Sequence, residues 1–445
     1  MPRALRRRRT GVGSYRAGRW DKSPGRWRPP SVEVRLARRA SRRATRLLFY
    51  VAYPMRLDLG AANAIQTYST VRELKRVLSG TQLAVPRWLR ERSAFDEIGA
   101  MHLPRPAINK LSRIISWAGW SYIERTLYAL MLVLLLVRWR VRRRGYRVLY
   151  VRDSVCAAWL SLLKGLHGAK VIYEVHDLEA SHPSKASKWP RPFWSRFLPW
   201  LDRAALTRSD RLVSLTETFR HWVATQHLHP ESEVVVIPDA FDPALYYPQD
   251  KMGARAVLGL PTDAYIIGYA GLTFAYRRLD LLVEAFASLT KAFPEMVLLL
   301  VGGRPDEVTE LRTLSEKLGI EPDRLVMPGQ VPQDRTALYL NASDVLVIPD
   351  TVTAMTASPL KLFEYMATGK PIVCKDMPAL REILDDTSAR FFESGDGEAL
   401  ADAISRMKLH PDESTELGAE ALRRSACYTY QARALQIVEV VKSCL

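Results

Sequence analysis

Short apolar runs alternate with segments of helical periodicity from residue 47 almost to the end of the chain. Runs of about four to eight apolar residues flanked by turn residues are typical of parallel strands buried on both faces. In the first half of the chain they lie at 47–53, 147–151, 170–175, 211–215 and 233–237. In the second half they lie at 264–271, 297–303, 324–327, 344–348 and 370–374. With helical patterns between them, starting at 61–78, the alternation predicts an α/β protein with two doubly wound parallel sheets.

A chain of 445 residues is too long for one hydrophobic core, which favours one domain per sheet. We expect an N-terminal Rossmann-like domain at 47–245, a second at 250–427 and a last helix at 428–445. The connection around 238–262 carries four prolines, at Pro238, Pro243, Pro248 and Pro261. Ligands of open α/β sheets bind beyond the carboxyl ends of the strands, so site residues are expected there.

The net charge of +18 is concentrated at the N-terminus, where residues 1–46 hold fifteen Arg and one Lys against one Asp and one Glu. This composition predicts a basic, disordered tail that either attracts anionic lipid or has no role. A nucleic-acid-binding protein more often spreads its basic residues over a folded face, so we expect no nucleic acid partner. The tail lacks the apolar core of a secretory signal. Four scattered cysteines without a CxxC pair argue against a zinc site or a disulfide framework and fit a reducing compartment.

An apolar run at 126–137 is followed by a basic segment at 138–144. A membrane span needs about 20 apolar residues, whereas this run has 12 and is blocked upstream by Glu124 and Arg125. Trp117, Trp120 and Trp139 near its ends are typical of a helix in the plane of a membrane surface. We therefore expect an interfacial helix near 114–141, with a buried core helix and a true span as alternatives.

The stretch from Ser358 to Val373 predicts a helix that begins after Pro359, carries Glu364 in its middle, and ends at Gly369 before a strand. Free N–H groups at a helix N-terminus suit phosphate. A carboxylate further along the helix can accept hydrogen bonds from sugar hydroxyls. The alternative is an ordinary helix–strand unit with a solvated Glu364. Lys361, at the helix start, is either a phosphate contact or a surface residue.

Other candidates also follow predicted strands. His176 ends the strand at 170–175, and its neutral ring can donate one hydrogen bond and accept another; Asp177 is placed to fix its tautomer. The turn at 60–63 brings backbone close to a ligand or is a plain helix entry. Arg277 and Arg278 either neutralise a diphosphate or begin a solvated helix. Arg152 ends a further strand and is expected to face an acceptor.

The motif from Ser358 to Val373 resembles that of the retaining glycosyltransferases of family 4, which have the GT-B fold of two Rossmann-like domains facing each other across a cleft. Glu364 matches the second of that family's two glutamates, whereas the first would fall at Thr356. The family's phosphate-binding lysine aligns with Arg277, while Leu272 replaces its arginine and Arg278 its glycine. Asp239-Ala240 stands where Asn-Gly is more usual at the hinge.

The resemblance implies site residues one by one. His176 matches the histidine that contacts the donor sugar and is the expected catalytic residue. The expected donor-binding residues are Gly60, Asn63, Arg277, Arg278, Gly303, Gly329, Val331, Ser358, Pro359, Leu360, Lys361 and Glu364. No metal is implied: cationic side chains and a helix N-terminus stabilise the leaving diphosphate, and Asp385-Asp386 is expected in a turn.

The resemblance also implies a function: transfer of a hexose from a nucleoside-diphosphate sugar to a hydroxyl, with retention, and no cofactor. A lipid-linked or polysaccharide acceptor in cell-envelope synthesis is expected. The protein would then be cytoplasmic and peripheral at the inner face of the membrane, in contact with anionic lipid. The alternatives are a nucleotide-sugar epimerase or a sugar phosphorylase on the same fold, and a non-catalytic membrane adaptor that uses the basic tail.

Overall fold

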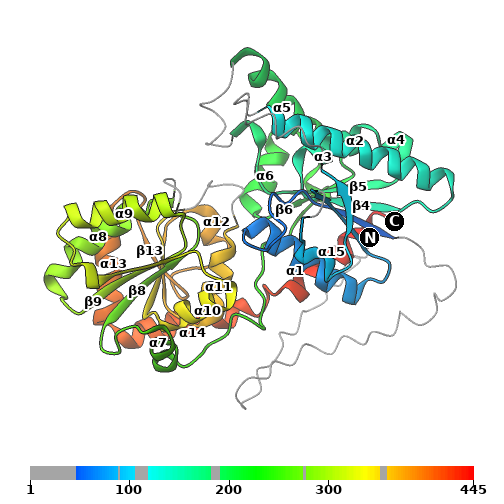
Figure 1. Ribbon diagram of the computed structural model, residues 1–445. Helices are drawn as coiled ribbons and strands as arrows, with labels where there is room; N and C mark the ends of the chain where they lie inside the picture. The colour runs from blue at the N-terminus through cyan, green and yellow to red at the C-terminus, as the bar shows by residue number, and fades with distance from the viewer. Residues whose placement is uncertain (1–46, 89–90, 106–118, 182–190, 274–276, 351–357) are drawn as a thin grey trace, which may run out of the picture. The chain divides into compact units, whose positions relative to one another are not determined.

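The computed structural model describes residues 47–88, 91–105, 119–181, 191–273, 277–350 and 358–445. Both predicted sheets are present in this part of the chain, and every strand pair in each is parallel. Their helices and strands are drawn in Figure 1. The structure thus confirms an α/β protein with two Rossmann-like sheets.

The first sheet has seven strands in the order β3-β2-β1-β4-β5-β6-β7. The strands are β1 (Leu48–Val51), β2 (Gln82–Arg87), β3 (Met101–Pro104), β4 (Val148–Val151), β5 (Lys170–Val175), β6 (Arg211–Ser214) and β7 (Val234–Val236). The helices of this half are α1 (Ala62–Val77), α2 (Trp120–Val141), α3 (Ser154–Leu162), α4 (Lys164–His167), α5 (Arg191–Arg208) and α6 (Glu217–Thr225).

The second sheet has six strands in the order β10-β9-β8-β11-β12-β13. The strands are β8 (Tyr265–Ala270), β9 (Met296–Val301), β10 (Leu325–Gly329), β11 (Val345–Ile348), β12 (Ile372–Lys375) and β13 (Arg390–Phe392). The helices are α7 (Lys251–Leu258), α8 (Leu279–Ala292), α9 (Pro305–Lys317), α10 (Gln333–Ala342), α11 (Leu360–Thr368), α12 (Pro378–Arg381), α13 (Gly397–Leu409), α14 (Pro411–Ser425) and α15 (Tyr430–Ser443).

All ten predicted strands are confirmed, but β2, β3 and β13 were missed. The strands that apolar runs reveal are buried along their length, as in β1 and β9. By contrast, β3 is an edge strand and is only partly buried, and β2 contains Pro86. Short strands at the edge of a sheet, such as β3 and β13, need not be apolar, and the proline in β2 argues against a strand inside a sheet, so periodicity reveals none of the three.

The chain passes from the first sheet to the second after β7 and returns between α14 and α15. The two crossing segments pair at Phe241 and Thr429, with a hydrogen bond of 3.0 Å from the Phe241 N–H to the Tyr428 carbonyl. Beyond this pair, α15 packs against α1. Ile437 and Val441 of α15 share a buried cluster with Leu48 of β1. The C-terminal helix is therefore part of the core of the first sheet.

As predicted for a helix near 114–141, α2 continues through Glu124 and Arg125, which interrupt only the apolar run. Glu124 accepts a hydrogen bond from Arg105, and Arg125 donates to Asp153 at 2.7 Å and to Glu179 at 2.9 Å. Pairing of this kind makes burial of the charges tolerable. Residues 114–118 of the predicted helix, with Trp117, lie outside the described residues.

One face of α2 belongs to the core of the first sheet, with Tyr128, Leu132 and Leu136 fully or almost fully buried. Of the helices that the structure describes, α2 alone is long and apolar enough to cross a membrane by length and composition. A core helix passes the same test.

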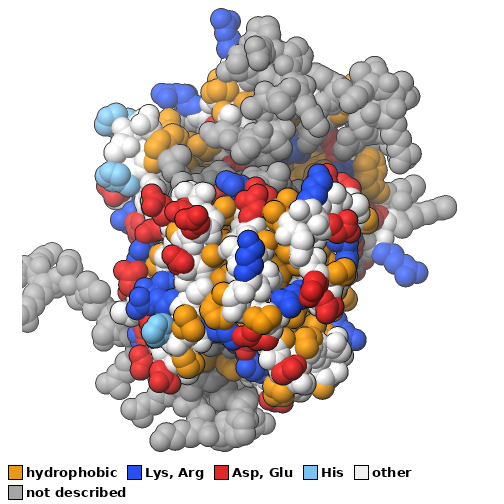
Figure 2. All heavy atoms as spheres, turned by 90° about the vertical axis from the view of Figure 1, so that its left-hand side faces the viewer, with side chains coloured by type: hydrophobic (Ala, Val, Ile, Leu, Met, Phe, Trp, Pro, Cys, Tyr) orange, Lys and Arg blue, Asp and Glu red, His pale blue; other side chains and the backbone are white. Residues whose placement is uncertain are grey.

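Charge on the folded part of the chain is mixed. On the face drawn in Figure 2, acidic and basic side chains are interspersed, and neither sign forms a continuous patch. This face carries no one-sided basic surface of the kind typical of nucleic-acid-binding domains.

Candidate functional site

The predicted helix around Glu364 is α11, which ends at Gly369 in the left-handed conformation that glycine adopts readily (φ +69°). Two tyrosine hydroxyls connect α11 to β8 by hydrogen bonds. The Tyr365 hydroxyl accepts from the Ala270 N–H at 2.7 Å, and Lys361 Nζ donates to the Tyr269 hydroxyl at 2.6 Å. Lys361 is buried, like almost the whole of α11, and it contacts Tyr269 near the end of β8. The alternative that Lys361 is a surface residue is therefore wrong.

Lys361 and Glu364 have strongly perturbed pKa values. Burial holds the pKa of Lys361 well below its usual value, and the nearby charge of Arg277 lowers it further. Burial raises the pKa of Glu364 to about 7, although the Tyr246 hydroxyl donates to the carboxylate and opposes the shift. Two cations and a carboxylate thus act on one another at this end of the second sheet, an arrangement typical of ligand sites.

Glycines line the carboxyl ends of the three neighbouring strands β8, β9 and β10; we call Gly271, Gly302, Gly303 and Gly329 the glycine edge. A Cβ atom at Gly302 would lie 2.0 Å from the Gly271 carbonyl oxygen, and one at Gly303 would lie 2.7 Å from Thr273 Oγ1. All four have positive φ. A side chain is excluded by contact at Gly302 and Gly303 and disfavoured by the positive φ at Gly271 and Gly329, so the backbone here is open to close approach by a ligand.

The glycine edge lies directly beside the cation of Lys361. A Cβ atom at Gly271 would lie 3.0 Å from Lys361 Nζ, and Gly302 N–H donates to the Gly329 carbonyl at 2.8 Å. Bare backbone next to a buried ammonium group is suited to the oxygens of a diphosphate.

The two arginines before α8 differ in their surroundings. Arg277 is close enough to Lys361 to lower its pKa. Arg278 precedes the helix with φ +52° and donates to the carboxylate of Asp280 at 3.1 Å. Of the predicted pair, Arg277 is therefore the one the structure brings together with α11.

A cavity of about 150 Å³ adjoins Glu364. It is lined by Tyr246 and by Tyr430, the first residue of α15, and also by Ile65 and Arg72 of α1. Arg72 donates to Asp242 at 2.8 Å, in the segment that leads into the second sheet. The cavity therefore joins Glu364 to side chains of the first sheet's helices.

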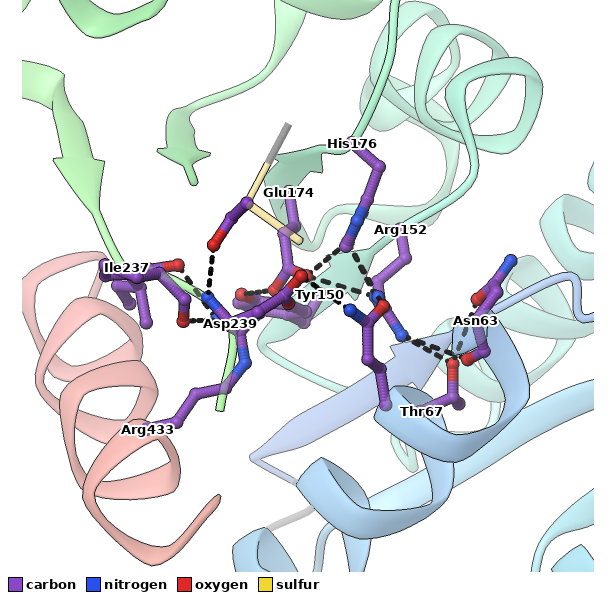
Figure 3. Close-up of polar contacts among 12 residues, drawn as sticks. Asn63, Thr67, Tyr150, Arg152, Glu174, His176, Ile237, Asp239 and Arg433 are labelled. Carbon is purple, nitrogen blue, oxygen red and sulfur yellow. Dashed lines mark hydrogen bonds and ion pairs between the residues drawn. The ribbon is translucent and has the colours of Figure 1, made fainter. Parts of the chain in front are cut away.

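His176 belongs to a second group of polar residues, at the carboxyl ends of β4 and β5 (Figure 3). Its Nε2 lies 2.5 Å from Glu174 Oε1 and 2.8 Å from Arg152 Nη2. Glu174 is fully buried and also pairs with Arg433 of α15, whose Nη2 lies 2.7 Å from Glu174 Oε1. We call Arg152, Glu174, His176 and Arg433 the His176 cluster.

A chain of hydrogen bonds leads from the His176 cluster to the start of α11. Arg152 Nη2 donates to Gln66 Oε1 at 2.7 Å, and Gln66 Nε2 donates to Asp239 Oδ2 at 2.6 Å. The Asp239 N–H then donates to Ser358 Oγ at 3.1 Å. Polar groups of both sheets are therefore connected through the first crossing segment.

The structure sorts the predicted residues as follows. Lys361, Arg277 and Glu364 act on one another in the domain of the second sheet, and Gly303 and Gly329 lie at strand ends of that sheet, whereas His176 lies at the first sheet. Ser358 and Pro359 directly precede α11, which Leu360 begins, and Val331 follows β10.

The candidate residues of the first domain, other than His176, have partners within that domain. Asn63 lies on α1, where its carbonyl accepts from Arg152 Nη1 at 3.4 Å, and the Gly60 N–H donates to Asp58 at 3.0 Å. The expectation that Arg152 faces an acceptor is wrong: its side chain is 3% exposed and is committed to the His176 cluster. Thr356 lies outside the described residues.

Sequence reasoning missed Glu174, Arg433, Gln66, Tyr246 and Tyr269. Glu174 had a local signal, since it stands two residues before His176 and alternate residues of a strand share one face. Asp177, chosen from sequence to orient the ring, accepts from the neighbouring Leu178 N–H at 2.9 Å. Arg433 lies 257 positions after His176 in the numbering, and no local pattern links the two.

Two family models match the chain. The model of glycosyl transferases group 1 matches residues 250–424, and that of glycosyltransferase family 4 matches residues 97–245. The chain belongs to the group 1 glycosyltransferases of family 4 type. The resemblance read from the motif at 358–373 is thereby confirmed at the level of the family.

Curated relatives in this family include D-inositol 3-phosphate glycosyltransferases. That of Stackebrandtia nassauensis is 27% identical over 287 residues, which is 62% of this chain and 62% of the relative. That of Corynebacterium urealyticum is 28% identical over 197 residues, 43% of this chain and 46% of the relative. The chain thus matches less than two thirds of the length of these relatives.

Solved structures share the fold. Sucrose-phosphate synthase from Thermosynechococcus elongatus has a TM-score of 0.69 at 19% identity and covers 89% of this chain and 98% of its own. HepE of Anabaena in complex with UDP has a TM-score of 0.68 at 15% identity, covering 89% and 100%; it has also been solved with UDP-glucose. These similarities show the GT-B fold.

Proposed function

We propose that the protein transfers a sugar from a nucleoside-diphosphate sugar to a hydroxyl acceptor, with retention of the anomeric configuration. The observation that carries this proposal is the buried Lys361, which lies beside the glycine edge and near Arg277. Glu364 follows three residues later on the same helix. Cations and open backbone suit a diphosphate, and a carboxylate suits the hydroxyls of a ribose.

The chemistry of these groups supports transfer. Departure of a nucleoside diphosphate builds negative charge, which Lys361, Arg277 and the N-terminus of α11 are placed to stabilise without a metal. His176 presents a ring to the sugar from the first sheet. The D-inositol 3-phosphate glycosyltransferases and the UDP-glucose complex of HepE lend support as relatives of this chain.

Donor titration tests the proposal. A panel of nucleoside-diphosphate sugars, starting with those of uridine and guanosine, is titrated calorimetrically into the full-length protein. We expect saturable binding of one of them, weakened several-fold in Glu364→Gln because the amide is a poorer acceptor for ribose hydroxyls. Absence of binding across the panel would remove the basis of the proposal.

The pH dependence sharpens this prediction. Since the pKa of Glu364 is raised to about 7, its carboxylate is ionised at about pH 8 and mostly protonated at about pH 6. Ribose hydroxyls donate best to the ionised form, so donor affinity should fall up to about tenfold between these pH values. In Glu364→Gln the fall should disappear. An equal fall in the variant would assign the effect to another group.

We further propose peripheral attachment to the anionic inner face of the membrane, where a lipid-linked acceptor would lie. Leu127, Leu134 and Val141 recur every seven residues along α2 and therefore share one face. Leu134 is 71% and Val141 78% exposed. The arginines at 142 and 143, which directly follow the helix, are exposed as well. An apolar stripe ending in basic residues complements an anionic lipid surface.

Vesicle sedimentation tests this attachment. The protein should bind vesicles with phosphatidylglycerol far better than pure phosphatidylcholine, and high salt should release much of it. Leu134→Gln with Val141→Gln should weaken binding about tenfold or more. The matched control is Val257→Gln, an exposed valine of α7. Unchanged binding in the double variant would contradict the role of α2, and retention in alkaline carbonate would indicate a span.

A further inference from the structure

The His176 cluster contains more charge than a histidine needs for packing. The Glu174 carboxylate and the Arg152 guanidinium contact one nitrogen of the imidazole ring, and the Arg433 guanidinium pairs with that carboxylate. All three side chains are at most 3% exposed. The third charged partner comes from the C-terminal helix. The hydrogen-bond partners of the cluster indicate which nitrogen of the His176 ring carries the proton.

Each N–H-bearing nitrogen of Arg152 has an oxygen acceptor. Nη1 donates to Thr67 Oγ1 at 2.6 Å, Nη2 to Gln66 Oε1 at 2.7 Å, and Nε to Glu174 Oε1 at 3.1 Å. Nε and Nη2 also lie 3.0 and 2.8 Å from His176 Nε2, so the guanidinium of Arg152 and the carboxylate of Glu174 compete for this ring nitrogen. The shorter contact of His176 Nε2 is the one with Glu174, at 2.5 Å.

An ionised carboxylate and a nitrogen lone pair would repel each other at 2.5 Å, and this shortest contact of the ring favours a proton on Nε2 when Glu174 is charged. Burial alone would raise the pKa of Glu174, but the charges of Arg433 and Arg152 hold it well below its usual value. Its other oxygen accepts from the Tyr150 hydroxyl. Burial lowers the pKa of His176, with Arg152 adding to the effect, so the ring is neutral near pH 7.

We propose that Glu174, held ionised by Arg433 and Arg152, fixes His176 in the tautomer that is protonated on Nε2. Nδ1 is then left as a hydrogen-bond acceptor for a hydroxyl of the bound sugar. Arg433, Arg152 and Glu174 are positioning residues, since they act through the ring. This assignment rests on the proposed function for the identity of the hydroxyl, but the proton on Nε2 does not depend on it.

Arg433 gives the C-terminal helix a part in the site. Its Nη1 donates to the carbonyls of Ile237, at 2.8 Å, and Pro238, in the first crossing segment. Its Nη2 pairs with Glu174. Without this cation, Glu174 would be buried with less positive charge and would take up a proton more readily. A protonated Glu174 donates to Nε2 and moves the ring proton to Nδ1, which would remove the acceptor.

Nitrogen NMR of the full-length protein labelled with ¹⁵N-histidine tests the tautomer directly. The signals of His176 are identified by their loss in His176→Ala. We expect the neutral form protonated on Nε2 in the wild type, and a shift of the population toward protonation on Nδ1 in Arg433→Met. A wild-type ring protonated on Nδ1, or an unchanged tautomer in folded Arg433→Met, would overturn the proposal. The wild-type spectrum decides even if the variant fails to fold.

Arg255 offers a matched control. It is as deeply buried as Arg433, pairs with Asp344 at 2.6 Å and donates to the carbonyls of Thr262 and Ala264. Arg255→Met therefore removes a similar set of contacts within the second sheet's domain. We expect it to lose stability and to leave the His176 tautomer unchanged. A tautomer change in this variant as well would mean that loss of any buried arginine suffices, which overturns the assignment.

Kinetics give the second readout. In Arg433→Met, kcat should fall about tenfold to a hundredfold while donor KM changes little, and Arg433→Lys should recover much of the rate. An equal loss of kcat in Arg255→Met would make Arg433 merely structural and contradict the proposal. If the wild type binds donors but transfers no sugar, the proposed function fails, while the NMR result stands or falls on its own.

Discussion

Replacing Lys361 with methionine is expected to weaken donor binding about a hundredfold. The ammonium group is buried, its pKa is held well below the usual value, and it lies beside the glycine edge where a diphosphate fits. A bound diphosphate restores a full charge partner to this cation. Hydrogen bonds to charged groups are each worth about 1.5–3 kcal/mol, and losing more than one accounts for the expected effect.

The free energy of unfolding of Lys361→Met should not fall with the donor affinity. Methionine matches the length of lysine and needs no charge partner, so Lys361→Met should fold at least as stably as the wild type. Loss of affinity without loss of stability is typical of a residue kept for binding. Calorimetric titration with the donor and thermal unfolding measure the two quantities.

Lys251→Met is the control for this variant. Lys251 pairs with Asp344 at 2.7 Å on the surface of the second sheet's domain, so its loss should leave donor affinity unchanged. Folded Lys361→Met with wild-type affinity would remove Lys361 from the site and with it the main support for a bound diphosphate.

The sequence predicted the two sheets because their strands are buried on both faces and so read as uninterrupted apolar runs. The four residues of β1 are buried without exception. An apolar run does not predict that Glu174, a carboxylate in β5, is buried. It is tolerated there because Arg433 and Arg152 neutralise it. Tertiary pairing at this separation leaves no trace in local periodicity.

The helix α2 shows the same limit. From sequence, Glu124 and Arg125 limit the apolar run to 12 residues, although the predicted helix near 114–141 includes both. In the structure their partners Arg105, Asp153 and Glu179 come from other elements, and the helix continues. Charge within an apolar segment can be interpreted only when its partners are known.

The candidate site was predictable where it follows strand ends and the motif around Glu364. The sequence could not decide between a surface role and a phosphate role for Lys361. That choice depends on Tyr269 of β8, which takes the ammonium group over its ring at 3.9 Å from the ring centroid. The glycine edge likewise depends on three strands that only the fold places side by side.

Loss of the His176 ring is expected to lower turnover far more than stability. The side chain is 27% exposed, and the charges beside it retain other partners, since Arg152 keeps Gln66 and Thr67 and Glu174 keeps Arg433. His176→Ala should therefore cost about 1 kcal/mol of unfolding free energy. A well-placed acceptor at the reacting sugar is worth about a hundredfold or more in rate.

The measurement is release of nucleoside diphosphate with and without an acceptor, since transfer requires the acceptor whereas epimerisation does not. His167 provides the contrasting variant: it is buried, and its Nε2 lies 2.9 Å from the Leu160 carbonyl. His167→Ala should lower the melting temperature more than His176→Ala while keeping the acceptor-dependent rate. If His176→Ala instead lost its fold and kept its rate in the folded fraction, His176 would be a structural residue. The first sheet would then contribute no ring to the sugar, and the transfer chemistry would have to be sought among the groups around α11.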